Sequence, residues 1–210
     1  MDERNFDIKK VLEGLRKKRK YFSSEADFQL ALAMQIEGKY GDNSVICEYV
    51  PEYKPEVENF NSRRIHIDIL YCKENIPIEL KYRTKKADLV DNNNYKISLT
   101  NQGARDEGSY GFWRDVSRIK EYIDNTNATK GFVVFLTNDN WYKCPDYNIR
   151  QANKYEDFNL NDTNKEKRSG HVSNKEKELN NLPKIKAEWI DWDEKEGFIC
   201  YIAKIPAKEE

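Results

Sequence analysis

Two carboxylates and a lysine stand close together in the stretch HIDILYCKENIPIELKYR, residues 66–83. Asp68 lies in one apolar run, and Glu79 and Lys81 lie in the next. Both runs alternate apolar and polar residues, which is typical of strands joined by a tight turn. If the turn is centred on Lys73–Glu74, Asp68 lies directly opposite Glu79. The sequence therefore predicts two acids side by side on one sheet face, with Lys81 on the same face.

Like charges placed opposite one another destabilise a sheet, so these two acids need a cation. A lysine supplies one positive charge, whereas Mg²⁺ supplies two and prefers carboxylate oxygens, water and substrate phosphate as ligands. The alternative is a solvated face with an ordinary ion pair, because the same acid-x-lysine spacing recurs at Asp7/Lys9 and Glu37/Lys39. Only the copy at Glu79 lies in an apolar strand that faces an acid across a hairpin.

The hydrophobic pattern predicts the elements that position these residues. Helices are expected over Phe6–Leu15, from the capping residue Ser24 to Gly38, and over Tyr110–Asp124. Strands are expected at Ser44–Val50, Arg64–Tyr71 and Ile76–Tyr82, and at the fully apolar GFVVFLTN of residues 131–138. From Ser24 to Asn138 the order of elements is therefore α-β-β-β-α-β.

Other segments show weaker patterns. PEYKPEVENFNSRR (51–64) predicts a loop, and Thr84–Gly108 predicts an irregular excursion over one face. Residues Gln151–Pro183 are dominated by polar and charged side chains, which predicts an irregular insertion at about 151–183. The tail, about 184–206, contains two alternating segments and predicts a β-hairpin that extends the sheet or packs beside it. We expect 210 residues to form a single domain with its core at about 24–138.

The composition limits the partners and the compartment. A formal net charge of −1 gives no global attraction to nucleic acid, so a local patch would have to hold any polyanion. The four cysteines have neither metal-ligand nor disulfide-framework spacing. Because we find no transmembrane run and no secretory signal, we expect a cytoplasmic protein without a membrane partner.

Asp68, the IELK of Ile78–Lys81 and the order of elements together resemble the PD-(D/E)XK nuclease superfamily. The resemblance covers roughly Ser24 to Asn138, and the tail is similar to that of small uncharacterised bacterial members. It implies an α/β restriction-endonuclease-like fold: a mixed central sheet flanked by helices, plus a C-terminal β-hairpin extension. Ile67 stands where the motif often has a proline, which weakens the resemblance more than the chemistry.

This resemblance implies a Mg²⁺-dependent endonuclease that hydrolyses DNA phosphodiester bonds by metal-activated water, with Mn²⁺ as a substitute. It is the kind of enzyme found in restriction, repair or mobile-element defence. Asp68, Glu79 and the backbone carbonyl of Leu80 would be metal ligands, and Lys81 would orient or activate the attacking water. Glu25 matches a helical glutamate that many members aim at the metal, and an acid favoured by the helix dipole is an equally good interpretation.

Basic residues near the second strand are candidates for nucleic-acid contact. Arg83, Lys85 and Lys86 follow the strand and would neutralise phosphates, and Arg105 would approach the site from the next segment. An ordinary solvated charge run explains the same residues equally well.

Two further interpretations concern assembly and function. Asp115 and Arg118 lie three apart in the predicted second core helix and predict a surface ion pair. Many nucleases of this fold act as dimers, so a homodimer is an additional expectation. The alternative function is a non-catalytic nucleic-acid-binding or assembly module that keeps the fold without the chemistry.

Overall fold

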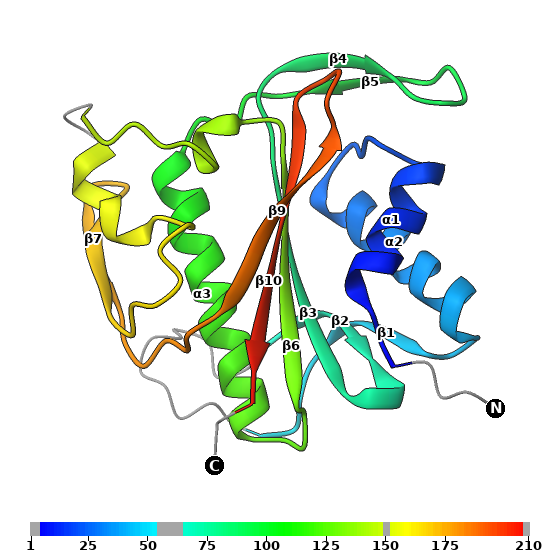
Figure 1. Ribbon diagram of the computed structural model, residues 1–210, viewed down its shortest axis with the longest axis horizontal. Coiled ribbons are helices and arrows are strands. Elements are labelled where there is room, and N and C mark those ends of the chain that lie inside the picture. The colour runs from blue at the N-terminus through cyan, green and yellow to red at the C-terminus, as the bar shows by residue number, and fades with distance from the viewer. Residues whose placement is uncertain (1–4, 54–64, 149–151, 208–210) are drawn as a thin grey trace.

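A computed structural model describes residues 5–53, 65–148 and 152–207. Its main sheet contains β1 (Val45–Tyr49), β2 (Ile67–Tyr71), β3 (Ile76–Arg83), β6 (Lys130–Thr137), β9 (Lys186–Asp193) and β10 (Phe198–Pro206). The strand order is β1-β2-β3-β6-β10-β9, in which only β3 and β6 run parallel. Helices α1 (Ile8–Lys18) and α2 (Glu25–Tyr40) cover one face, and α3 (Arg105–Asp124) covers the other (Figure 1). This is a mixed α/β architecture with a mixed central sheet.

Helix α2 begins where the sequence predicts. The Ser24 side chain accepts a hydrogen bond from the backbone N–H of Asp27, which satisfies one of the free donors of the first turn. Phe28, Leu32 and Ile36 are fully buried at helical spacing. The cap thus fixes the place where the chain enters the helix, and the apolar stripe fixes which side meets the sheet.

The sheet separates two hydrophobic cores. Ile78 and Leu80 of β3 belong to the core under α1 and α2, whereas Val133 and Phe135 of β6 belong to the core under α3. Because side chains alternate along a strand, Glu79 between two buried residues must emerge on the α3 face. None of the helices in the described residues combines the length and the apolar character needed to cross a bilayer.

The predicted register between the first two motif strands is confirmed. Ile69 pairs with Ile78 and Tyr71 pairs with Ile76, so the turn is centred between Lys73 and Glu74. The turn itself is a short 3₁₀ helix, η1 (Cys72–Glu74), followed by Asn75 in the left-handed conformation. The strand β2 begins at Ile67, three residues later than the expected Arg64.

The prediction of an irregular segment over Thr84–Gly108 is wrong. It contains the hairpin strands β4 (Ala87–Val90) and β5 (Lys96–Leu99), and α3 begins at Arg105. The Asp91 carboxylate accepts hydrogen bonds from two backbone N–H groups of the turn, at Asn93 and Tyr95. Local turn chemistry and two buried leucines therefore replace the long apolar pattern that the segment lacks. The hairpin projects beyond one end of the sheet (Figure 1).

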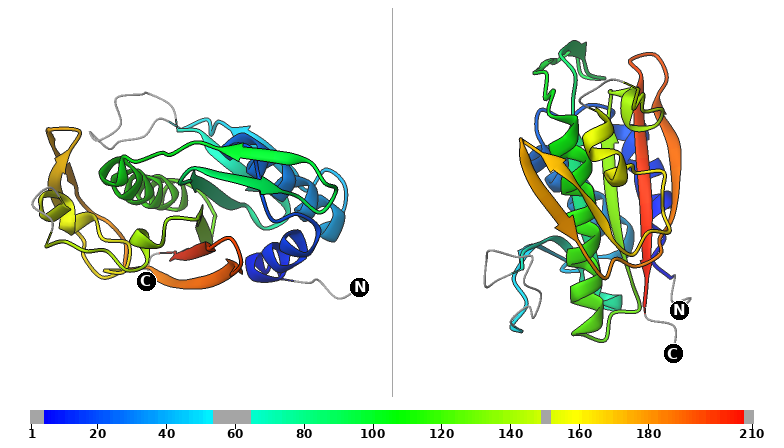
Figure 2. Two further views of the ribbon diagram at one scale, coloured as in Figure 1. Left: turned by 90° about the horizontal axis from the view of Figure 1, so that it is seen from above. Right: turned by 90° about the vertical axis from the view of Figure 1, so that its left-hand side faces the viewer.

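The prediction of an irregular insertion is also wrong for the described residues 152–183. They form η3 (Ala152–Phe158), β7 (Arg168–Val172) and β8 (Lys175–Leu179), after a 3₁₀ turn η2 (Asn140–Tyr142). A few apolar side chains, such as Phe158 and Leu179, join the core under α3. The fully buried Arg168 guanidinium lies 3.5 Å from the ring centroid of Trp113 on α3. This layer packs along the outer side of α3 (Figure 2).

The predicted C-terminal hairpin is confirmed, whereas the predicted loop at 51–64 is described only in part. The tail forms the antiparallel pair β9 and β10, and β10 joins the sheet beside β6. Of the predicted loop at 51–64, residues 51–53 have no regular structure, and residues 54–64 lie outside the described residues.

Candidate active site

The site forms where β2 and β3 separate. Strand β2 pairs with β3 only as far as Ile78, so the backbone of β3 beyond that residue has no strand partner on this side in the described chain. Asp68 Oδ2 accepts a hydrogen bond from the Leu80 N–H at 2.7 Å, and Glu25 Oε2 accepts one from the Tyr82 N–H at 2.8 Å. Two acids thus replace a neighbouring strand, which brings the first turn of α2 and the start of β2 to the same place.

Two ion pairs connect this strand to α3. Arg118 Nη1 donates to Glu79 Oε2 at 2.7 Å, and Lys81 Nζ lies 2.8 Å from Asp115 Oδ2. Asp115 Oδ1 is also 3.3 Å from Arg118 Nη1, so the four side chains form one network. The predicted pair Asp115–Arg118 therefore exists, but its expected surface location is wrong, because Asp115 is fully buried against β3.

Sequence reasoning missed Asp115 and Arg118 as members of the site. A signal was present, because Asp115 lies between Phe112 and Ile119 on the apolar stripe of α3. Gly111 lies one turn earlier, where an added Cβ would come within 3.3 Å of Lys81 Cε. The helix is thus shaped to receive the Lys81 side chain and to present a carboxylate to its ammonium group.

The Asp68 carboxyl is an unusually weak acid. Burial raises its pKa to about 6, and the negative charges of Asp115 and Glu25 act in the same direction. The hydrogen bond from Leu80 and the charge of Lys81 oppose this rise without cancelling it. Asp68 therefore sits in an environment that lacks enough positive charge for its ionised form.

The neighbouring charged side chains also shift the pKa values of Glu79 and Lys81. Burial raises the pKa of the Glu79 carboxyl, as does the charge of Asp68, although Arg118 opposes the rise. Burial alone would lower the pKa of Lys81, but the neighbouring carboxylate of Asp115 and other acids outweigh it, so the pKa is raised. Lys81 accordingly remains a protonated ammonium group at neutral pH.

The cluster contains more acids than bases. Among the residues that the structure describes, three carboxylates (Asp68, Glu79 and Asp115) face two cations (Lys81 and Arg118). The cluster therefore carries a net negative charge when it is fully ionised. A buried charge excess of this kind is costly unless a further cation compensates it.

The available oxygen donors fit a hard cation. Glu79 Oε1 is buried and has no hydrogen-bond partner, and Asp68 lies on the neighbouring strand, where its Oδ2 accepts the Leu80 N–H. The Leu80 carbonyl oxygen accepts a hydrogen bond from Lys81 Nζ at 3.3 Å. The described residues hold no group of three or more acid, histidine or cysteine side chains around one metal position. The candidate donors are therefore the carboxylates of Asp68 and Glu79 and the backbone carbonyl of Leu80.

A cavity of about 390 Å³ adjoins Lys81 and Glu25. Its other walls are mostly hydroxyl and amide side chains, at Ser23, Ser24, Thr84, Ser98, Thr100 and Gln102, together with Arg83. Strand β5 contributes one side of this cavity, so the β4–β5 hairpin borders the approach to Lys81. The cavity is polar and wide enough for part of an extended polar chain.

The predicted nucleic-acid contacts separate into two groups. Arg83 lines the cavity, and Lys86 is exposed. Lys85 and Arg105 instead both pair with Asp139, at 2.9 Å and 2.7 Å. The structure thus leaves Arg83 and Lys86 available for a phosphate, while Lys85 and Arg105 share the single carboxylate of Asp139 and keep one net positive charge between them.

No family model matches the chain, and no match was found among curated proteins or among solved structures.

Proposed function

We propose that the protein is a Mg²⁺-dependent nuclease of the PD-(D/E)XK type that hydrolyses phosphodiester bonds within DNA. The observation that carries the proposal is the excess of carboxylate charge at the open edge of β3, with a protonated Lys81 beside it. The order α2-β1-β2-β3-α3-β6, with the β4–β5 hairpin between β3 and α3, is one observation in support of this proposal. Mn²⁺ is the expected substitute metal, and cleavage could serve restriction, repair or defence.

Asp68, Glu79 and the carbonyl of Leu80 would hold the metal. Mg²⁺ at these ligands supplies Lewis acidity, which neutralises phosphate charge and makes water a better nucleophile. Hard carboxylate and carbonyl oxygens suit this ion. Its charge would also relieve the raised pKa of both carboxyl groups, since each is unfavourably buried when ionised.

Lys81 acts as a charge, not as a base. Its raised pKa keeps the ammonium protonated, so it can stabilise the negative charge that develops on a phosphate under attack. Asp115 holds this ammonium at 2.8 Å and so fixes its direction from α3. Glu25, whose Oε2 accepts the Tyr82 N–H, lines the polar cavity and has a second carboxylate oxygen.

The second candidate function is a non-catalytic binding or assembly module. The ion pairs Glu79–Arg118 and Lys81–Asp115 favour it, because they could serve only to fasten α3 to the sheet. Such a network would not need Asp68, whose carboxylate has no side-chain cation within ion-pair distance among the described residues. The uncompensated acid therefore favours the enzyme.

A cleavage assay separates the two functions. Purified protein is incubated with supercoiled, linear and branched DNA in Mg²⁺ or Mn²⁺, beside Asp68→Asn prepared identically. Asp42→Asn, at an exposed turn position, is the matched control. We expect the wild type and the control to cut at least one substrate and Asp68→Asn to cut none. Equal cleavage by Asp68→Asn would show that this carboxylate is not a metal ligand, and an inactive wild type that binds no metal would support the binding module.

A further inference from the structure

The backbone of Asp68 is not held by the sheet. Within β2, which the structure describes in full, Asp68 alone pairs with neither neighbouring strand. On the β1 side, pairs form at Ile67 and Ile69 but not between them, and on the β3 side the pairing ends at Ile69. A residue outside the ladder of strand hydrogen bonds needs other contacts to fix its position.

Glu48 stands opposite Asp68 in the register of β1, and its backbone conformation coincides with the missing pair. Its φ is +52°, in the left-handed region that residues other than glycine seldom adopt. The Glu48 side chain lies against α2, where its Oε1 accepts a hydrogen bond from Gln29 Nε2 at 2.8 Å. A strained backbone of this kind persists only where the surrounding contacts hold it.

The Gln29 side chain supplies a hydrogen bond in place of strand pairing. Its Nε2 donates to the backbone carbonyl oxygen of Asp68 at 2.6 Å and to Glu48 Oε1 at 2.8 Å. A carbonyl oxygen and an ionised carboxylate oxygen can only accept, so the amide nitrogen of Gln29 has to face both of them. Glu48 therefore orients the Gln29 amide, and Gln29 holds the backbone of Asp68.

Asp68 is thus held at two points, one on its backbone and one on its side chain. Gln29 holds the carbonyl oxygen, and the Leu80 N–H donates to the carboxylate at 2.7 Å. Both contacts act on the same residue, so a shift of the Asp68 backbone would also displace its carboxylate from Leu80.

Helix α2 reaches both strands at the place where they separate. Glu25 and Gln29 are four residues apart, so their side chains lie on the same face of the helix. Glu25 accepts the Tyr82 N–H of β3, and Gln29 donates to Asp68 of β2. One helix face therefore sets the position of β2 relative to β3.

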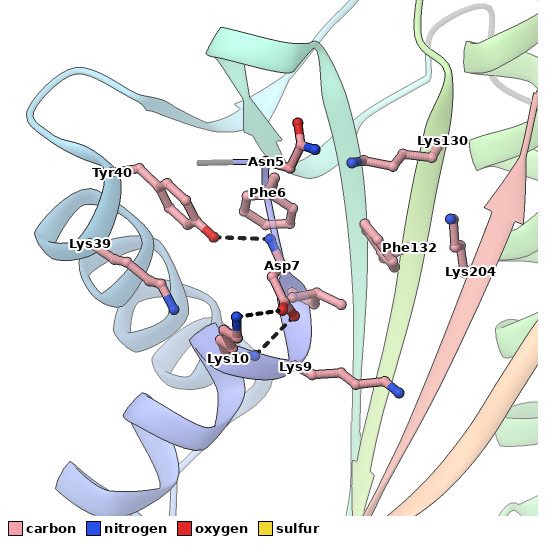
Figure 3. A pocket seen from close by; sticks show the side chains of 11 residues that line it. Asn5, Phe6, Asp7, Lys9, Lys10, Lys39, Tyr40, Lys130, Phe132 and Lys204 are labelled. Carbon is pink, nitrogen blue, oxygen red and sulfur yellow. Dashed lines mark hydrogen bonds and ion pairs between the residues drawn. The ribbon is translucent and has the colours of Figure 1, made fainter. Parts of the chain in front are cut away.

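This helix is anchored at both ends. Near its start, the Arg19 guanidinium donates two hydrogen bonds to the Asp27 carboxylate, at 2.7 and 2.6 Å. At its other end, the Tyr40 hydroxyl accepts the backbone N–H of Asp7 at 2.9 Å, as Figure 3 shows. A helix that is fixed in this way can hold a functional side chain precisely.

We propose that Gln29, oriented by Glu48, is a positioning residue that holds Asp68 where it can bind the metal ion. Its effect on metal binding and cleavage rests on the proposed function, whereas its effect on the contact between Asp68 and Leu80 does not require a metal. Side chains that hold a metal ligand from behind typically change metal affinity by about 10–100-fold when they are replaced.

Amide hydrogen exchange of the metal-free protein in EDTA, followed by nuclear magnetic resonance, tests the positioning role. In Gln29→Met the Leu80 amide should exchange about tenfold faster than in wild type, because the Asp68 carboxylate is no longer held beside it. The Tyr82 amide, which Glu25 accepts, should be unchanged. Gln35→Met is the matched control on the same helix, since Gln35 accepts the Lys18 ammonium instead, and it should resemble wild type at both amides.

Two substitutions of Glu48 test the orienting role. Glu48→Gln keeps an oxygen acceptor for Gln29 and should preserve the wild-type exchange of Leu80. Glu48→Gly removes the acceptor, and glycine adopts a φ of +52° without strain, so this variant should fold even where Gln29→Met does not. Its Leu80 amide should exchange about threefold faster or more. Urea unfolding checks that each variant is folded.

Calorimetric titration of Mn²⁺ links the contact to the metal. Gln29→Met should bind Mn²⁺ at least about tenfold more weakly than wild type, and Gln35→Met should bind as wild type does. A wild type that binds no Mn²⁺ would refute the proposed metal site, and the exchange of the Leu80 amide in EDTA would still decide the role of Gln29.

Three results would overturn the inference. The first is an exchange rate of the Leu80 amide that is the same in Gln29→Met and wild type. The second is equal acceleration of Leu80 and Tyr82, because Gln29 would then only fasten α2 to the sheet. The third is an unchanged Mn²⁺ affinity of Gln29→Met beside a wild type that binds the ion.

Discussion

Replacing Asp68 with asparagine should stabilise the metal-free protein. The residue is mostly buried, its pKa is raised to about 6, and burial is the largest cause. The asparagine side chain would be uncharged and would still offer an oxygen to the Leu80 N–H. The groups that act on Asp68 are Asp115 of α3 and Glu25 of α2, which raise the pKa, and Lys81 of β3, which lowers it. Removing the charge relieves the repulsion from both acids.

The size of the effect follows from proton linkage. An aspartate of ordinary pKa 3.8 whose folded-state pKa is about 6 loses about 3 kcal/mol of folding free energy when it is fully ionised. Because the folded-state pKa is the higher one, stability is lost as the pH rises from about 4 to above 6. The advantage of Asp68→Asn should therefore be up to about 3 kcal/mol at pH 8 and about half of that at pH 5.

Urea unfolding in EDTA at both pH values, followed by tryptophan fluorescence, measures this difference directly. Asp42→Asn serves as the exposed control and should change the free energy of unfolding by less than about 0.5 kcal/mol. Addition of Mn²⁺ should stabilise the wild type but not Asp68→Asn. A variant that is less stable than wild type at pH 8, or a gain that does not depend on pH, would refute the claim that Asp68 is an uncompensated acid.

Three other substitutions test the site and the layer that packs on the outer side of α3. Lys81→Ala should abolish or severely reduce DNA cleavage. Its Mn²⁺ affinity in calorimetry should stay within about threefold of the wild-type value, because the ammonium group is not a metal ligand. Loss of metal binding would contradict this role. Arg118→Met should lower the free energy of unfolding, measured in urea, by about 3–5 kcal/mol at pH 8. The loss should be smaller at pH 5, because Glu79 can take up a proton there. An equal loss at both pH values would contradict the pairing of Arg118 with Glu79. Arg168→Met should destabilise the protein by about 2–4 kcal/mol and alter the near-ultraviolet dichroism of Trp113, because the partly buried carbonyls of Asp157 and Asp162 lose their donor. An unchanged spectrum and midpoint would exclude this role.

The paired acids could be predicted from sequence because two simple rules determine them. The two-residue period of a strand assigns Asp68 and Glu79 to a face, and the centre of a short turn assigns their register. Both rules act over few residues, so no distant contact could change the outcome. The structure confirms the register through the pairing of Ile69 with Ile78.

The partners of these residues could not be predicted in the same way. Arg118 and Asp115 are near each other in sequence, and only the packing of α3 against β3 shows that they face Glu79 and Lys81. Periodicity places a residue on a helix face but does not say which strand lies under it. The position of Asp115 on the apolar stripe was the one sign that it required a buried cation.

The two missed hairpins have a similar explanation. Strands β4, β5, β7 and β8 are only four or five residues long, and β7 and β8 are largely polar, so their own patterns are too weak to predict strands. They are ordered by contacts with the rest of the chain, such as the buried Arg168 over Trp113. The same limit explains why the shared ion pairs of Lys85 and Arg105 with Asp139 were not predicted.

Calorimetric titration of Mn²⁺ at pH 6, repeated in buffers of different ionisation enthalpy, tests the central claim most directly. The Asp68 pKa of about 6 and the raised Glu79 pKa predict one bound ion per chain, with release of about half a proton or more, because a carboxyl group must ionise to bind metal. Asp68→Asn should lose both the binding and the proton release. Absence of Mn²⁺ binding by the wild type, with or without DNA, or unchanged binding and proton release in Asp68→Asn, would contradict a metal site at Asp68 and Glu79.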